Sequence, residues 1–233
     1  MRAATPPRRG RVWPLVALLL GGAGLLAVII AIALSEPREG EVEITGVSDA
    51  QRTLGGLRQD GPFIGSPEAR VTVEVFNDLQ CSSCAGWELE TIPPLVESLV
   101  RERRARLRFR HFPMGQRERG LAAFGAGSAA LQDREWQYVT IFYANQAKVS
   151  DTGVTDQFLT QVASSVPDLD LGQWDSERDA GEVEERLAAD EEEAVRLRLP
   201  VGPAVVVLGP RGSRELVESP SAAKIEAAVR EVS

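Results

Sequence analysis

The stretch VTVEVFNDLQCSSC, residues 71–84, decides the fold. Its first part, Val71–Phe76, alternates β-branched side chains, which predicts a β-strand. The pair Cys81 and Cys84 follows this strand, and apolar residues then recur at helical spacing over residues 87–99. The sequence therefore predicts a Cys-x-x-Cys pair at a strand-to-helix junction.

This placement of the cysteines indicates a chemistry. Cys81 is expected at the start of the helix, where unpaired backbone N–H groups and the positive helix end stabilise a thiolate. In Cys-x-x-Cys settings the thiol pKa falls to about 3.5–7.5 from about 8.5. Cys84 lies one turn further on, where it can attack a mixed disulfide formed at Cys81. We therefore predict thiol–disulfide exchange, with Cys81 as the exposed attacking thiol and Cys84 as the sheltered resolving thiol.

An inert stabilising disulfide is the alternative interpretation of the same pair. The loop that it closes is short and removes little chain entropy, so it would be a weak staple. An exported chain does, however, reach the oxidising compartments in which such staples persist. We favour the redox interpretation, and the residues alone leave both open.

The N-terminal segment predicts export. No charged residue occurs from Val12 to Ser35, and about 20 apolar residues suffice to cross a hydrocarbon core of about 30 Å. Arginines precede this run and acids follow it, so we expect a cytoplasmic basic tail at residues 1–11 and a single transmembrane anchor at residues 12–35. A signal peptide cleaved after Ala33 is the alternative, but the apolar run is longer than a usual signal core. In either case the remaining chain lies outside the cytoplasm.

Composition excludes several classes of function. The net charge is −8, from 26 basic and 34 acidic residues, and four of the basic residues precede residue 12. The remainder is therefore strongly acidic and repels phosphate backbones, so no nucleic-acid partner is expected. Two cysteines and one histidine are too few for a four-ligand zinc site. We expect no metal and no other cofactor.

The exported part is predicted to be an extracytoplasmic linker at residues 36–60, with one short helix near residues 49–57, and a domain at residues 61–233. Pro93 and Pro94 should kink the helix that follows the cysteines. The order of elements indicates an α/β core with a helical insertion at about residues 115–199. Further elements are expected as a strand at 105–112, helical patterns at 121–147, 155–164 and 181–199, strands at 203–208 and 215–217, and a helix at 221–229.

Three weaker features receive structural interpretations. The acidic cluster Asp190–Glu193 is expected to be the solvated face of the last insertion helix. His111, the only histidine, is interpreted as a structural or surface residue without a base role. The aromatic residues Trp136, Tyr138 and Phe142 are expected in the core.

Other motifs accompany the cysteine pair in a fixed order. They are GSPEA at 65–69, the strand at 71–76 with Asp78, RHFPM at 110–114, the aromatic-rich helix ending at 136–146, and VGP at 201–203. Together with CSSC at 81–84 they resemble the DsbA-like thioredoxin-fold disulfide oxidoreductases, of the membrane-anchored bacterial type, over about residues 54–230. The resemblance implies a thioredoxin fold with an inserted helical subdomain, preceded by one N-terminal transmembrane helix.

The resemblance also implies roles for individual residues. Cys81 is the nucleophile and Cys84 the resolving thiol. Pro203 is expected to be a cis-proline beside the two sulfurs, since X-Pro bonds are where cis geometry costs least. Gly202 is expected to offer backbone hydrogen bonds to an extended substrate strand.

Three positions depart from the family pattern. Ser82 and Ser83 stand where strong oxidases often have Pro-His, so no imidazolium tunes the thiolate, although serine hydroxyls still can. The position six residues before the first cysteine, often a buried acid, is Val75. The neighbouring Glu74 points to the opposite face of the strand, so the proton acceptor for the resolving thiol stays unassigned. Gly202 replaces the usual threonine and opens space beside the disulfide.

We expect an extracytoplasmic thiol–disulfide oxidoreductase that oxidises cysteine pairs of exported proteins. Its expected partners are those proteins and a membrane redox protein that reoxidises it, quinone-linked and either vitamin K epoxide reductase-like or DsbB-like. The first alternative is a reductase or isomerase kept reduced by a membrane electron donor. The second is a membrane-anchored binding module with an inert disulfide.

Overall fold

The computed structural model describes residues 42–113, 120–150 and 153–233. The predicted cytoplasmic tail and transmembrane anchor lie outside these ranges, as does the first part of the predicted linker. Within them, every helix is too short or too polar to cross a bilayer. The residues from Val42 to Ser233 make up one unit, which is described here.

One mixed β-sheet organises the described residues, with its strands in the order β1-β2-β4-β3-β5-β6. The strands are β1 (Gln59–Asp60), β2 (Phe63–Ile64), β3 (Val71–Asn77), β4 (Ala105–His111), β5 (Ala204–Leu208) and β6 (Arg214–Val217). The long strand β3 runs parallel to β4 and antiparallel to β5. It is buried at all positions but Thr72. Val71, Val73 and Val75 face one apolar cluster while Phe76 faces another, so this strand is covered on both faces, as its nearly continuous apolar sequence requires.

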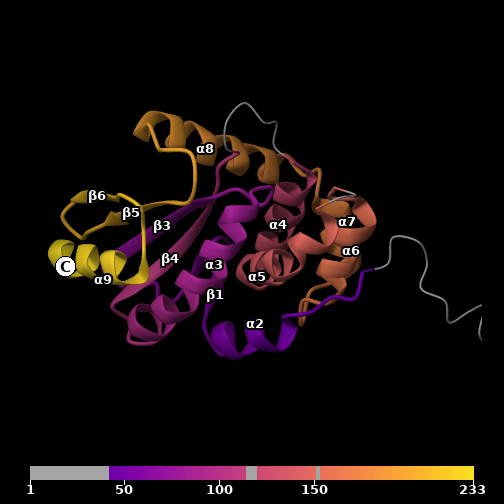
Figure 1. Cartoon of the computed structure of the whole chain (residues 1–233), viewed down its shortest axis with the longest axis horizontal. Coiled ribbons are helices and arrows are strands. Elements are labelled where there is room, and N and C mark those ends of the chain that lie inside the picture. Colours follow the sequence, from indigo (N-terminus) through magenta and orange to yellow (C-terminus); the bar gives the residue numbers. More distant parts are fainter. Residues whose placement is uncertain (1–41, 114–119, 151–152) are drawn as a thin grey trace, which may run out of the picture. The chain divides into compact units, whose positions relative to one another are not determined.

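Helices cover the sheet and form an insertion between β4 and β5 (Figure 1). They are α2 (Val47–Leu54), α3 (Ser82–Leu95), α4 (Leu121–Leu131), α5 (Glu135–Asn145), α6 (Asp156–Ser164), α7 (Leu171–Glu177), α8 (Gly181–Leu197) and α9 (Ala222–Val232). A π-helical turn (Val96–Val100) and a 3₁₀-helix (Gln146–Val149) follow α3 and α5. The insertion is α4 to α8, and it confirms the predicted helical subdomain.

Most predicted elements are present, and the differences have local causes. The pattern at 121–147 is two helices, because the chain reverses at Asp133, whose φ of 58° is left-handed. The short helix α7 and the hairpin of β1 and β2 were not predicted, because neither is long enough to show a period. Helix α3 continues through Pro93 and Pro94, and a π-helical turn begins at Val96, two residues after the second proline. The predicted kink at these prolines stays a prediction.

The predicted linker is wrong from Val42 onward, because this segment is part of the domain. Helix α2 buries Ala50 and Leu54 completely. Ahead of it, the backbone N–H of Thr45 donates to Oδ1 of Asn145 at 2.9 Å, and Nδ2 of Asn145 donates back to the Thr45 carbonyl at 2.9 Å. The mixed composition of this segment conceals one apolar face, since Gln51 and Arg52, between the two buried positions, are exposed.

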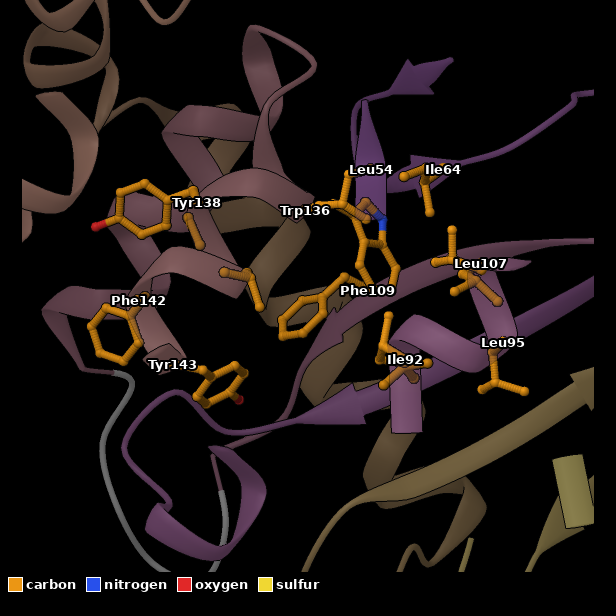
Figure 2. Close-up of a cluster of buried hydrophobic side chains, with 14 of the residues drawn as sticks. Leu54, Ile64, Ile92, Leu95, Leu107, Phe109, Trp136, Tyr138, Phe142 and Tyr143 are labelled. Atoms are coloured by element: carbon orange, nitrogen blue, oxygen red, sulfur yellow. The ribbon is translucent and has the colours of Figure 1, made fainter. Parts of the chain in front are cut away.

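The core joins the hairpin, the sheet and the insertion (Figure 2). Trp136 packs edge-on against Phe109 with ring centroids 5.8 Å apart, and its Nε1 donates to the Pro62 carbonyl at 2.9 Å. Tyr138 and Phe142 are also fully buried, so the predicted core role of these aromatic residues is confirmed. Each such side chain contributes about 1.5–3 kcal/mol by burial, and the insertion is thereby held on the part that carries the sheet.

The interpretation of Asp190 as a solvated residue is wrong. Asp190 is 1% exposed, and its Oδ1 accepts from Arg110 at 2.7 Å. Glu74 accepts from Nε of the same arginine at 2.8 Å. The arginine comes from the β4 face that α8 covers, and a buried guanidinium needs a charged partner. The pattern of α8 alone does not reveal this, because the demand for an acid arises on another element.

Candidate active site

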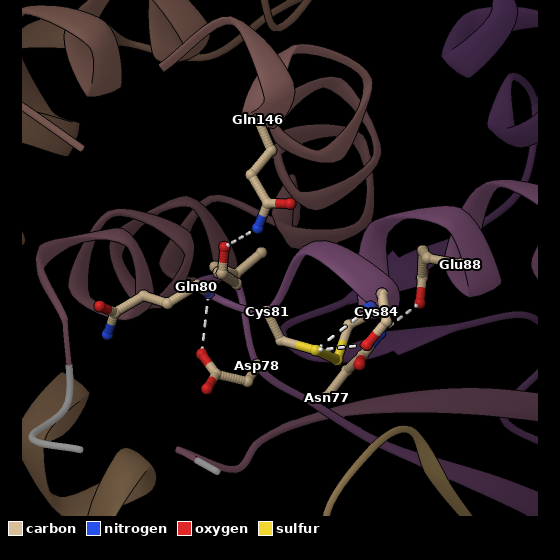
Figure 3. Close-up of a disulfide and its surroundings, with 9 residues drawn as sticks. Asn77, Asp78, Gln80, Cys81, Cys84, Glu88 and Gln146 are labelled. Carbon is tan, nitrogen blue, oxygen red and sulfur yellow. Dashed lines mark hydrogen bonds between the residues drawn. A yellow bond between two sulfur atoms is a disulfide. The ribbon is translucent and has the colours of Figure 1, made fainter. Parts of the chain in front are cut away.

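Cys81 and Cys84 form a disulfide at the start of α3, with their Cα atoms 5.2 Å apart (Figure 3). Cys81 is the N-cap residue and is partly exposed, whereas Cys84 is fully buried. Sγ of Cys81 accepts from the backbone N–H of Cys84 at 3.2 Å. The predicted arrangement of one accessible and one sheltered sulfur is therefore present.

The two residues between the cysteines are both exposed. Oγ of Ser83 lies 3.2 Å from Sγ of Cys81, so this hydroxyl can donate to a thiolate at that sulfur. Ser82 instead lines a groove beside the site. Of the two serines that the sequence analysis expected to stabilise the thiolate, Ser83 is the one whose hydroxyl lies within hydrogen-bond distance of Sγ of Cys81.

The loop before the cysteines is held from two sides. Oδ1 of Asp78 accepts from the backbone N–H of Gln80 at 2.8 Å. From the insertion, Nε2 of Gln146 donates to the Leu79 carbonyl (Figure 3). These bonds fix the backbone that presents Cys81, and one of them depends on the helical subdomain.

The prediction that Pro203 is a cis-proline is wrong. Among the described residues every peptide bond is trans, including the one before Pro203. The chain instead enters β5 through Gly202, whose φ of 115° lies where glycine is favoured over all other residues. Ala204, the first residue of β5, pairs with Phe76 of β3. The Gly-Pro segment thus lies beside the carboxyl end of β3, from which the chain continues toward the cysteines.

Gly202 and Pro203 line a hollow of about 400 Å³ together with Trp87 of α3. Nε1 of Trp87 donates to the carbonyl of Pro220, another residue of this hollow, at 2.6 Å, which fixes the indole in its wall. Trp87 lies within one helical turn of Cys84, so the hollow adjoins the active-site helix. The structure thus brings the predicted glycine and proline beside Trp87 of the active-site helix, while their expected place next to the two sulfurs stays a prediction.

A larger groove of about 830 Å³ lies between α3 and the insertion. Ser82, Ala85 and Leu89 form one wall, and Leu121 and Tyr143 belong to the other. Leu89 and Leu121 are 40% and 51% exposed. The sequence did not predict this groove, since its walls come from segments about thirty residues or more apart.

The structure also reveals a buried acid that the sequence analysis missed. Glu88 is 1% exposed and lies one helical turn after Cys84. Its Oε2 accepts from Nδ2 of Asn77 at 3.0 Å, and its Oε1 has no hydrogen-bond partner among the described residues. Burial raises the pKa of Glu88 to about 8, and the hydrogen bond from Asn77 opposes this only in part. The sequence signal that could have identified Glu88 is its position four residues after Cys84, because residues four apart lie on the same face of a helix.

The other titratable residues considered from the sequence have different partners. Glu74 is bound to Arg110, away from the thiols, as strand alternation predicted. Nε2 of His111 lies 2.7 Å from Glu135, which also pairs with Arg186 at 2.9 Å. His111 is buried, so its structural interpretation holds and its surface alternative does not.

Comparison with known proteins agrees with this site. A family model described as Thioredoxin matches residues 58–210. A curated relative from Bacillus cereus, "Probable disulfide bond formation protein D", is 27% identical over 149 residues, which are 63% of this chain and 69% of the relative.

Solved structures share the fold. Oxidised BdbD from Bacillus subtilis has a TM-score of 0.63 at 16% identity, with 74% of this chain and 92% of that chain covered. DsbA from Chlamydia trachomatis has a TM-score of 0.60 at 19% identity, with 73% and 90% covered. The chain therefore belongs to the thioredoxin family, has the DsbA-like form of its fold, and is a protein-disulfide oxidoreductase.

Proposed function

We propose that the protein oxidises cysteine pairs of exported proteins. A substrate thiolate attacks Sγ of Cys81, the Cys81–Cys84 bond breaks, and Cys84 leaves as a thiolate. A second substrate thiolate then attacks the mixed disulfide, so the substrate gains a disulfide and Cys81 leaves as a thiolate. The observation that carries this proposal is the disulfide itself, with its first sulfur accessible at the helix start and its second sulfur buried.

The direction of electron flow is supported by how the reduced site is stabilised. A Cys81 thiolate lies at the positive end of α3, with the Cys84 N–H and the Ser83 hydroxyl aimed at it. Stabilisation of the reduced form makes the disulfide more oxidising. Because Ser82 and Ser83 supply no imidazolium, we expect a milder oxidant than relatives with Pro-His.

We propose that the oxidase domain is held outside the cytoplasm by a single membrane anchor at residues 12–35. The support is the uncharged run with arginines before it and acids after it. A quinone-linked membrane protein would accept the electrons from reduced Cys81 and Cys84. After mild reduction, Cys81 in intact cells should react with a membrane-impermeant maleimide. Labelling only after lysis would refute the location.

Oxidation of a reduced, unfolded protein by the purified full chain tests the activity. Wild type should form substrate disulfides rapidly, whereas Cys81→Ser should match the uncatalysed rate. Equal, slow rates would refute the oxidase. Alkylation trapping in cells tests the direction, because an oxidase keeps Cys81 and Cys84 mostly oxidised, while a reductase or isomerase keeps them mostly reduced.

A further inference from the structure

Opening of the Cys81–Cys84 disulfide leaves a negative charge on the buried sulfur of Cys84. The attack on Cys81 releases Cys84 as a thiolate, and Cys84 is fully buried. An unpaired buried anion costs several kcal/mol, so a proton must reach this sulfur as the bond breaks. Glu74, the acid nearest in sequence to the usual family position, is bound to Arg110 instead.

Glu88 meets the geometric needs of a proton donor to Cys84. The two residues are four apart on α3, so their side chains lie on one face, about 5–6 Å apart at Cβ. Figure 3 shows Glu88 on the Cys84 side of the disulfide rather than the Cys81 side. Asn77 anchors one carboxyl oxygen of Glu88 from the end of β3, while the other oxygen is buried without a partner. An unpartnered buried carboxyl oxygen is suited to carry a proton.

We infer that Glu88 supplies the proton to the Cys84 thiolate when substrate opens the disulfide, and takes it back when the disulfide re-forms. This inference rests on the proposed oxidase function. In the first step the substrate–Cys81 bond forms, the Cys81–Cys84 bond breaks, and the carboxyl proton moves to Cys84, which leaves a Glu88 carboxylate and a neutral thiol. Reoxidation by the membrane partner reverses the proton transfer, and the electrons leave with that partner.

The surroundings of Glu88 keep its proton in place while the disulfide is intact. Glu88 makes no ion pair with any described residue. On α5, the buried Tyr143 has its pKa raised first by burial and then by the charges of Glu88 and Asp78. From β3, only the neutral Asn77 contributes to the pKa of Glu88, and no group of α9 does. Burial therefore dominates, and with a pKa of about 8 Glu88 is an acid at neutral pH.

The test compares the oxidised full chain in detergent with Glu88→Gln, using a reduced peptide with two cysteines. The wild-type rate per substrate thiolate should fall above about pH 8, where Glu88 loses its proton. Glu88→Gln keeps an acceptor for Asn77 but has no acidic proton, so its rate should lack this break and be about a hundredfold lower at neutral pH. The exposed Glu90 is the control, and Glu90→Gln should behave as wild type.

An unchanged rate and pH profile in Glu88→Gln would overturn the inference while leaving the oxidase intact. A wild-type rate equal to that of Cys81→Ser would overturn both. If Glu88→Gln does not fold, carbon-13 NMR of glutamate-labelled wild type decides the matter. One glutamate carboxyl should titrate near pH 8 in the oxidised protein. Titration of every glutamate near pH 4.5 in the oxidised protein would overturn the inference.

Discussion

Replacing Glu88 with glutamine should make the stability of the oxidised protein less dependent on pH. The pKa of Glu88 is about 8 in the folded state and 4.5 in the reference state. Between these values the unfolded chain releases a proton that the folded protein keeps, so stability falls as pH rises from 4.5 to 8. Below 4.5 both states are protonated and this cost is absent. Above 8 both are ionised and the full cost is present.

The magnitude follows from the width of this window. One pKa unit corresponds to about 1.4 kcal/mol, so the cost is on the order of 3 kcal/mol at neutral pH and on the order of 5 kcal/mol above pH 8. Glu88→Gln keeps the size of the side chain and the hydrogen bond from Asn77 but cannot ionise. It should therefore match wild type near pH 4.5 and become increasingly more stable than wild type toward pH 8.

Urea unfolding of the oxidised full chain, followed by tryptophan fluorescence, measures this difference. Each protein is unfolded at several pH values, and the difference in free energy between wild type and variant is plotted, which cancels contributions of all other groups. Glu90→Gln, on the exposed face of the same helix, should give a flat difference. A flat difference for Glu88→Gln as well would show that this carboxyl titrates normally and would refute the reasoning.

Three further changes test other parts of the structure. Asp190→Ala should destabilise the protein by about 3 kcal/mol because it leaves Arg110 buried with one acid fewer, as measured by urea unfolding; a loss below about 1 kcal/mol would contradict the buried pair. Phe109→Ala should cost about 3–5 kcal/mol in the same assay, since it removes a fully buried ring. Ser83→Ala should slow alkylation of reduced Cys81 several-fold at mildly acidic pH, because the thiolate loses a hydroxyl donor; an unchanged rate would remove Ser83 from the site.

Local pattern was sufficient for the elements around the cysteines. The β-branched alternation of Val71–Phe76 and the helical spacing after Cys84 predict β3 and α3, because both periods are properties of the local chain. The junction between them then places Cys81 at the helix start. The same reasoning predicted the insertion, since α6 and α8 each carry an apolar face and α4 is apolar on nearly every side.

Local pattern failed where the outcome depends on a partner from elsewhere in the chain. Asp190 reads as a surface acid, yet it is buried because Arg110 of β4 lies beneath α8. Residues 36–60 were interpreted as a linker with one short helix, yet from Val42 onward they belong to the domain, because α2 packs on α5 and Thr45, just before α2, bonds to Asn145.

In the active site, too, local sequence predicts some features and only the tertiary structure determines the others. Which residues carry the sulfurs follows from the order Cys-Ser-Ser-Cys after a strand, and this needs no knowledge of the fold. That Gly202 turns the chain with a trans proline, and that Glu88 is sealed from water beside Asn77, follows only from the packing of β3, β5 and α5 around α3. Burial sets the pKa of a carboxyl, and burial is a property of the assembled structure rather than of the chain.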